Sequence, residues 1–262
     1  MGVVKDRKIA VANLKKLTED PSKVLFVHYS ESSTYDDDDY GNISPIITSI
    51  VIKSLDGQTD KQFAIHLEAD KADIPKDQIQ DSYRELELRI LKLYNDFVRR
   101  HLDCFWIHWD MKNIHFGFEA IKHRYEKIFE NLDDYCEIPN NKKKNLRTII
   151  EGMYGDNFVS GSDTLKALML CNSSNVEDST YLSKDNESTQ FESKNFFAVI
   201  RSVDLKVDFI KNVTKKLSHK KLIVSNKNNY AIFVDMVDHP IFTFIGWIVG
   251  IIGLVLAIWP LK

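Results

Sequence analysis

The stretch KVLFVHYS, residues Lys23–Ser30, decides the fold that the sequence predicts. Its unbroken run of Val, Leu and Phe is typical of a strand buried inside a sheet. Two further strands are expected over Ser44–Leu55 and Gln62–Leu67, and the Asp56-Gly57 pair between them is a hairpin signal. The sequence therefore predicts three consecutive strands ahead of its first long helix.

Helical and strand patterns alternate on either side of these strands. An amphipathic helix is expected within residues 1–22, and a long helix over Lys76–Arg100, where apolar residues recur every three or four positions. A fourth strand, Cys104–Trp109, precedes helices whose main segments are Asn113–Phe129 and Lys194–Leu217. Three strands, a helix, a strand and further helices predict an α/β fold with a mixed sheet flanked by helices.

The overall composition is that of an ordinary folded protein, with 44% hydrophobic and 28% charged residues. These values exclude disordered, collagen-like and disulfide-rich chains. A net charge of -3 argues against electrostatic binding of nucleic acid by the whole chain. The cysteines Cys104, Cys136 and Cys171 form no C-x-x-C motif, which favours a reducing compartment.

The C-terminal stretch differs in composition from the rest of the chain. Residues 241–261 carry no charged side chain, and a helix of that length would extend about 30 Å, roughly the hydrocarbon thickness of a bilayer. Trp247 and Trp259 lie toward its two ends, where interfacial aromatic residues are common. We therefore expect a transmembrane helix over 241–261, preceded by a basic juxtamembrane linker over 219–240.

The charge before this stretch predicts its orientation. Six lysines lie between Lys211 and Lys227 with no acid among them, which places that side in the cytoplasm by the positive-inside rule. The expected location is the cell membrane, with a single pass and the bulk of the chain cytoplasmic. Membrane lipid is an expected partner, because these lysines can contact anionic head groups. A solvated helix face is the alternative interpretation of the lysines.

Small residues recur within the expected membrane helix, and a helix would bring them near one face. They are Gly246, Gly250, Gly253 and Ala257. Small residues let two helix backbones approach each other, so the spacing predicts a homo-oligomer formed through this helix. The alternative is that Gly is simply common in membrane helices.

Three places in the predicted soluble domain carry a family resemblance. The first strand ends with His28 and Ser30 two residues apart, the fourth strand leads into HWDMKN with Asn113 at its end, and a late helix carries Asp208. These places resemble the D-x-E, H-N-x-x-x-D and H-x-x-x-x-D motifs of the DEDD 3′–5′ exonucleases, whose RNase H-like fold has the same order of elements. The resemblance implies an RNase H-like domain over residues 23–218. Because non-acidic residues stand at three of the acidic places, it also implies a degenerate active site.

A second resemblance rests on the segments His28–Ser32 (HYSES), His108–Phe118 (HWDMKNIHFGF) and Ser202–Phe209 (SVDLKVDF). They are similar to motifs of a family of uncharacterised bacterial proteins. The similarity covers roughly residues 20–215 and implies no particular activity.

The chemistry of these residues leaves two classes of site open. A nuclease needs several carboxylates around Mg²⁺ or Mn²⁺, and the catalytic candidates are Glu31, Asp110 and Asp208. A degenerate domain would need no metal or other cofactor, and would bind nucleic acid, a nucleotide or a protein. The expected ligand-binding residues near the carboxyl ends of two strands are His28, Ser30, His108 and Asn113. Ser30 beside a histidine would be a nucleophile, and satisfied polar caps of the strands are the structural alternative.

The expected function combines these features. It is that of a tail-anchored membrane protein whose degenerate cytoplasmic domain acts as a sensor or effector, in particular a membrane-disrupting effector of antiviral defence by abortive infection. The alternatives are a membrane-tethered metal-dependent nuclease and a membrane adaptor that recruits a protein partner encoded nearby. Whether the chain is an enzyme is left open by the sequence.

Overall fold

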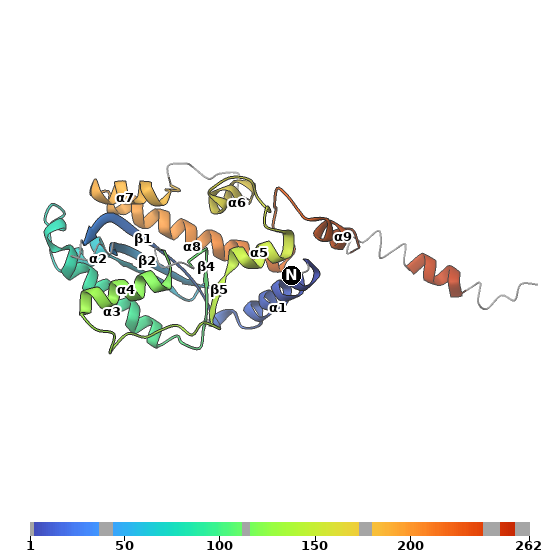
Figure 1. The fold of residues 1–262 in the computed structure, drawn as a ribbon, viewed down its shortest axis with the longest axis horizontal. Helices are drawn as coiled ribbons and strands as arrows, with labels where there is room; N and C mark the ends of the chain where they lie inside the picture. Colours follow the sequence, from blue (N-terminus) through green and yellow to red (C-terminus); the bar gives the residue numbers. More distant parts are fainter. Residues whose placement is uncertain (1–2, 37–43, 112–115, 173–179, 238–246, 255–262) are drawn as a thin grey trace, which may run out of the picture.

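Strand β1, Val24–Asp36, lies in the middle of a five-stranded mixed sheet. The computed structural model describes residues 3–36, 44–111, 116–172, 180–237 and 247–254. The strand order is β3-β2-β1-β4-β5. Figure 1 labels β1, β2, β4 and β5. The pairs β1–β2 and β2–β3 are antiparallel, whereas β1–β4 and β4–β5 are parallel. β1 is therefore antiparallel to one neighbour and parallel to the other. The other strands are β2 Ser44–Ser54, β3 Asp60–Ala64, β4 Phe105–His108 and β5 Lys143–Asn145.

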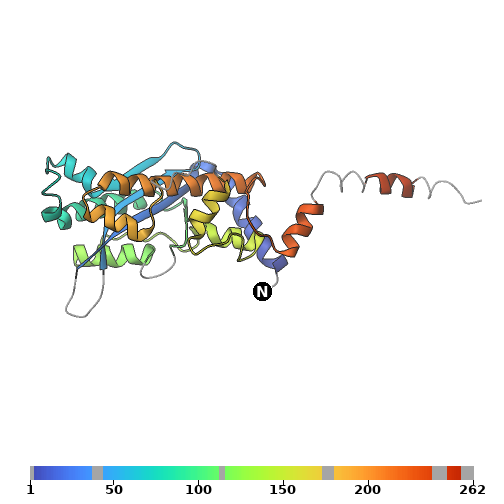
Figure 2. The ribbon, with the colours of Figure 1, turned by 90° about the horizontal axis from the view of Figure 1, so that it is seen from above.

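Helices cover both faces of this sheet, and Figure 2 shows the longest of them, α8, running along its length. One face packs against α1, α5, α6 and α8, and the other face against α3 and α4. α7 packs against α8 and β1. The helices are α1 Val3–Glu19, α2 Ile65–Lys71, α3 Tyr83–Arg99, α4 Phe118–Phe129, α5 Leu146–Tyr154, α6 Thr164–Asn172, α7 Lys184–Glu192, α8 Phe196–Ser218 and α9 Asn229–Val237, with short 3₁₀ turns at Pro21–Lys23 and Gln80–Ser82.

Burial on both faces explains the unbroken apolar run of β1. Val24 and Phe26 belong to the core on the α8 side, while Leu25, Val27 and Tyr29 belong to the core on the α3 side. Alternate residues of a strand point to opposite faces, so a strand covered on both faces needs apolar residues at successive positions. The predicted α/β fold with a mixed sheet is confirmed.

Several element boundaries differ from those that the sequence predicts. β1 continues to Asp36, where a strand through Ser30 is predicted. The third strand ends at Ala64 and α2 begins at Ile65, where a strand through Leu67 is predicted. The long helix begins at Tyr83 instead of Lys76. Ile79 is buried although it lies in the turn before the helix, so the apolar spacing extends past the point where the helix begins.

The prediction of a transmembrane helix over 241–261 is wrong. Within the residues that the structure describes, no helix is long and apolar enough to span a bilayer. The described part of the stretch, residues 247–254, is helical.

The residues expected to associate in the membrane fall partly within 247–254. Trp247 is 70% exposed, and a Cβ added to Gly250 or Gly253 would meet no atom within 4 Å. The remaining three, Gly246, Ala257 and Trp259, lie outside the described residues. Location at a membrane and association into a homo-oligomer stay predictions.

Candidate ligand-binding cleft

β4 ends at His108 while its parallel neighbour β1 continues, and a cleft lies beside β1 beyond the end of β4. Their pairing runs only from Val24↔Phe105 to Phe26↔Ile107, although β1 continues to Asp36. The cavity at this end has a volume of about 530 Å³. Its walls come from β1, the segment after β4, the starts of α5, α6 and α7, and α8. Ligands commonly bind at the carboxyl ends of strands in an α/β sheet.

Phe116 forms an aromatic wall of this cleft. Its ring stacks on that of Tyr29 with the centroids 4.6 Å apart, and it meets the ring of His28 edge-on at 5.6 Å. The N–H of Gly117 donates a hydrogen bond of 2.9 Å to the Tyr29 hydroxyl, which ties the segment after β4 to β1. Packing and this hydrogen bond therefore hold the wall in place before any ligand binds.

The imidazole of His28 lines the cleft and is almost fully buried, with 7% of the residue exposed. Among the buried side chains that the structure describes, its Nδ1 is the single nitrogen or oxygen without a hydrogen-bond partner. Burial lowers the pKa of His28 well below its usual range, and the charges of Lys206 and His108 add to the effect. The ring is therefore neutral at pH 7, with one N–H and one lone pair on its two nitrogens.

Three ion pairs join the walls of the cleft, and each links different elements. They are Lys184–Glu31, Arg147–Asp110 and Lys206–Glu187. In the most buried of them, Nζ of Lys206 lies 2.8 Å from the Glu187 carboxylate, and the two side chains are 5% and 3% exposed. Burial raises the pKa of Glu187 although the Lys206 ammonium opposes the shift. α7 is thereby joined to both β1 and α8.

Asp110, at the end of β4, is held from the neighbouring strand. Its backbone is left-handed, with φ 55°, which is uncommon outside Gly. Nδ2 of Asn145 donates to its carboxylate at 3.2 Å, and Arg147 donates to the other oxygen at 2.5 Å. Asn145 also caps α5 by accepting the N–H of Arg147 at 3.0 Å. A single residue at the end of β5 thus positions both the acid and the start of a helix.

The remaining charged group of the cleft, Asp163, is also engaged. Its carboxylate accepts the hydroxyl of Tyr181 at 2.7 Å and the N–H of Lys166 at 3.0 Å. Burial raises the pKa of Tyr181, so its hydroxyl keeps the proton that it donates. Nζ of Lys206 lies 5.0 Å from the Tyr181 ring centroid, within cation–π range. Every charged side chain that lines the cleft therefore has a partner within its own chain.

The three predicted catalytic carboxylates do not converge. Glu31 and Asp110 line the cleft, whereas Asp208 bonds Nζ of Lys53 on β2 at 2.8 Å. Lys53 is in register with Phe26, five residues before Glu31, which is roughly 16 Å away along β1. Within the described residues, no three acidic, histidine or cysteine side chains are grouped so that they could hold a metal ion.

The predicted ligand-binding residues have different environments. His28 and Ser30 line the cleft, and Oγ of Ser30 lies 2.6 Å from the hydroxyl oxygens of Thr48 and Ser49, which makes it part of a hydroxyl cluster on β1 and β2. His108 is buried, and its Nδ1 accepts the N–H of Met111 at 3.1 Å, so it serves as a cap after β4. Asn113 lies outside the described residues.

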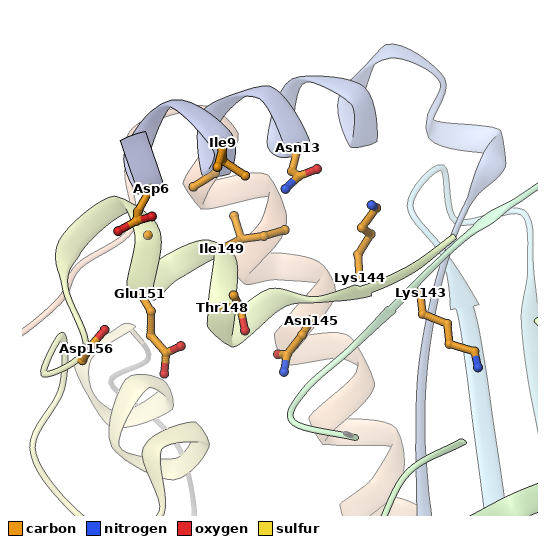
Figure 3. A pocket seen from close by; sticks show the side chains of 12 residues that line it. Asp6, Ile9, Asn13, Lys143, Lys144, Asn145, Thr148, Ile149, Glu151 and Asp156 are labelled. Carbon is orange, nitrogen blue, oxygen red and sulfur yellow. The ribbon is translucent and has the colours of Figure 1, made fainter. Parts of the chain in front are cut away.

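A second hollow, of about 360 Å³, lies between α1 and α5 (Figure 3). The two helices approach closely beside it, since a Cβ added to Gly152 would lie 3.0 Å from Cβ of Ala10. Burial lowers the pKa of Lys144 at its edge, with Lys16 and Lys142 contributing. None of its described residues is a buried side chain that lacks a hydrogen-bond partner, so the cleft is the stronger candidate.

Sequence reasoning missed Lys206, whose signal is nevertheless in the chain. Val203, Val207 and Ile210 mark the buried stripe of α8, and Lys206 falls among them at helical spacing. A lysine on a buried stripe needs an acidic partner, which Glu187 supplies.

Compared with known proteins, the chain matches no family model, no curated protein and no solved structure.

Proposed function

We propose that the protein is a sensor domain that binds a small polar molecule in the cleft beside β1, beyond the end of β4. The observation that carries this proposal is the unpartnered Nδ1 of His28. A buried polar atom without a partner costs about 1–3 kcal/mol of stability. His28 lines the cleft, so a ligand that reaches this nitrogen and supplies the missing hydrogen bond recovers this cost.

The walls of the cleft support binding because they are organised in advance. Ion pairs fix α7, α8 and α5 around the cavity, and Phe116 is stacked in place. Preformed walls lower the entropy cost of binding, since few side chains must be ordered when the ligand arrives. The cavity volume is also within the usual range for small-molecule sites.

The placement of the carboxylates supports binding over two-metal hydrolysis. That reaction needs several carboxylates around ions about 4 Å apart. Glu31 and Asp110 are each paired with a cation, and Asp208 belongs to a separate ion-pair cluster with Lys53. We also propose that a protein partner responds to ligand binding. α7 is the element through which it would do so, because ion pairs join α7 to the cleft.

A thermal-shift experiment on the full chain tests the proposal. Adenosine, AMP, glucose, glucose 6-phosphate, glycine and glutamate are the probes. At least one should raise the melting temperature of the wild type and leave that of His28→Leu unchanged. His28→Asn is the matched control, because its amide places a polar atom near the position of Nδ1. Equal shifts in wild type and His28→Leu, or no shift with any probe, would contradict the proposal.

A nuclease assay separates the sensor from the enzyme. Labelled DNA and RNA are incubated with the full chain and Mg²⁺ or Mn²⁺. The proposal expects no cleavage above that of an Asp208→Ala control. Cleavage that disappears in this variant would overturn the proposal in favour of a nuclease.

A further inference from the structure

We propose that the ligand of the cleft is an uncharged molecule that presents an amide or hydroxyl group to His28. This inference rests on the proposed function and names the chemical class that the same site selects. It excludes ligands whose recognition depends on a phosphate, carboxylate or ammonium group.

Six of the seven charged side chains that line the cleft are balanced in ion pairs. Three cations and three acids form three ion pairs, and the seventh charged group, Asp163, accepts two hydrogen bonds. An anionic ligand would have to compete with Glu31 for Lys184 or with Asp110 for Arg147. The displaced acid would then remain inside the cleft beside the new anion, which is repulsive in a partly desolvated site.

A cationic ligand would have to compete with a cation of the cleft for a carboxylate. Asp163 is exposed, so an ion pair with it would contribute little. The most buried carboxylate of the cleft is Glu187, which is already 2.8 Å from Lys206 in the least exposed pair. Breaking that pair would leave an ammonium buried without its counterion. An uncharged ligand leaves all three pairs intact, so the cleft discriminates against charge of either sign.

Among the buried side-chain atoms that the structure describes, the one without a hydrogen-bond partner is an uncharged nitrogen. Nδ1 of His28 is either a donor or an acceptor, depending on which nitrogen carries the proton. Amides and hydroxyls can satisfy both tautomers because each both donates and accepts. The nearby ammonium of Lys206 and the burial of the ring keep the imidazole neutral, so the recognised group meets no charge at this point.

Three probes of nearly equal shape test this selectivity: acetamide, acetate and acetamidinium. The full chain is titrated with each, and the imidazole Cε1–H signal of His28, assigned by comparison with His28→Asn, is followed by NMR. Acetamide should shift this signal saturably, with a dissociation constant on the order of millimolar for so few atoms. Acetate and acetamidinium should bind at least about tenfold more weakly.

A matched variant should reverse the discrimination against an anion. Glu31→Gln removes the acid that neutralises Lys184 while keeping nearly the same shape. Acetate should therefore bind this variant about tenfold more tightly than it binds the wild type, with acetamide binding unchanged. Circular dichroism melting of both proteins checks that the fold is retained.

The outcomes distinguish the inference from the proposed function. If acetate or acetamidinium binds the wild type as well as acetamide does, the cleft takes ligands but the inference is overturned. If none of the three shifts the His28 signal, the inference is overturned, and the proposed function is then decided by the thermal-shift probes.

Discussion

The guanidinium of Arg124 on α4 and the carboxylate of Glu87 on α3 form an ion pair in the interior, with side chains only 2% and 0% exposed. Nε of Arg124 lies 2.6 Å from Oε1 of Glu87, and the N–H of Ile47 donates to the same oxygen at 2.8 Å. Ile47 follows an irregularity in the β1–β2 pairing, so the carboxylate accepts a hydrogen bond from the strand at that point.

Arg124→Met should destabilise the protein by about 3–5 kcal/mol, because it leaves the Glu87 carboxylate buried without its counterion. Urea unfolding measures the loss. The double variant Glu87→Gln/Arg124→Met should recover a large part of it, since the amide oxygen still accepts the N–H of Ile47. Equal losses in the single and double variants would contradict this explanation.

Stability should depend on pH through His28. The pKa of His28 is lowered in the folded state. Between pH 6.5 and the folded pKa, His28 is therefore protonated in the unfolded chain and neutral in the folded chain. The contribution is therefore fully present above pH 6.5 and is lost as the pH falls, at up to about 1.4 kcal/mol per pH unit.

Urea unfolding of the wild type and of His28→Asn at pH 7.5, 6.5 and 5.5 measures this contribution. The wild type should lose more stability than the variant between pH 6.5 and 5.5. Parallel curves would show that His28 titrates normally in the folded protein.

Lys53 on β2 should stabilise α8 against the mutual repulsion of two acids. Its Nζ lies 2.7 Å from Asp204 and 2.8 Å from Asp208, which are one turn apart on α8. Lys53→Met should cost about 1 kcal/mol at low salt, and the loss should shrink in 1 M NaCl because repulsion between the acids is screened. As a control, Asp208→Asn should leave acetamide binding unchanged, because this cluster lies away from the cleft.

Gly152→Ala should destabilise the protein, against the usual preference of helices for Ala. The added Cβ would lie 3.0 Å from Cβ of Ala10 and 3.1 Å from the carbonyl oxygen of Asp6. Forcing α1 away from α5 should cost about 1–3 kcal/mol. Thermal unfolding of this variant beside Gly152→Ala/Ala10→Gly checks the cause, since the second change removes the clashing methyl group and should restore part of the stability.

The sequence predicted the elements of the fold better than the site. The apolar run of β1 and the stripes of α3 and α8 depend on local periodicity, which a single sequence displays directly. The site depends on which side of a helix faces the sheet. Asp208 and Lys206 are two residues apart on α8, so they project about 200° apart. The acidic residue suggested by the exonuclease motif therefore points away, and the lysine that no motif marks faces the cleft.

The C-terminal prediction failed for a different reason. The uncharged stretch 241–261 has the composition of a membrane span, but composition does not say where a helix begins or ends. The sequence also showed no sign of strand β5. β5 contains the polar residues Lys143–Asn145 and has no apolar alternation, yet it completes the parallel edge of the sheet.

The position of Asn145 has a consequence for communication across the molecule. This residue holds Asp110 in the cleft and starts α5, and the other end of α5 lies against α1 at Gly152. The nine residues of α5 span about 13 Å as one rigid rod. If a ligand displaces Asp110, the displacement would reach the amino-terminal helix through this single element. A partner protein seated on α1 would sense occupancy of the cleft without touching the ligand.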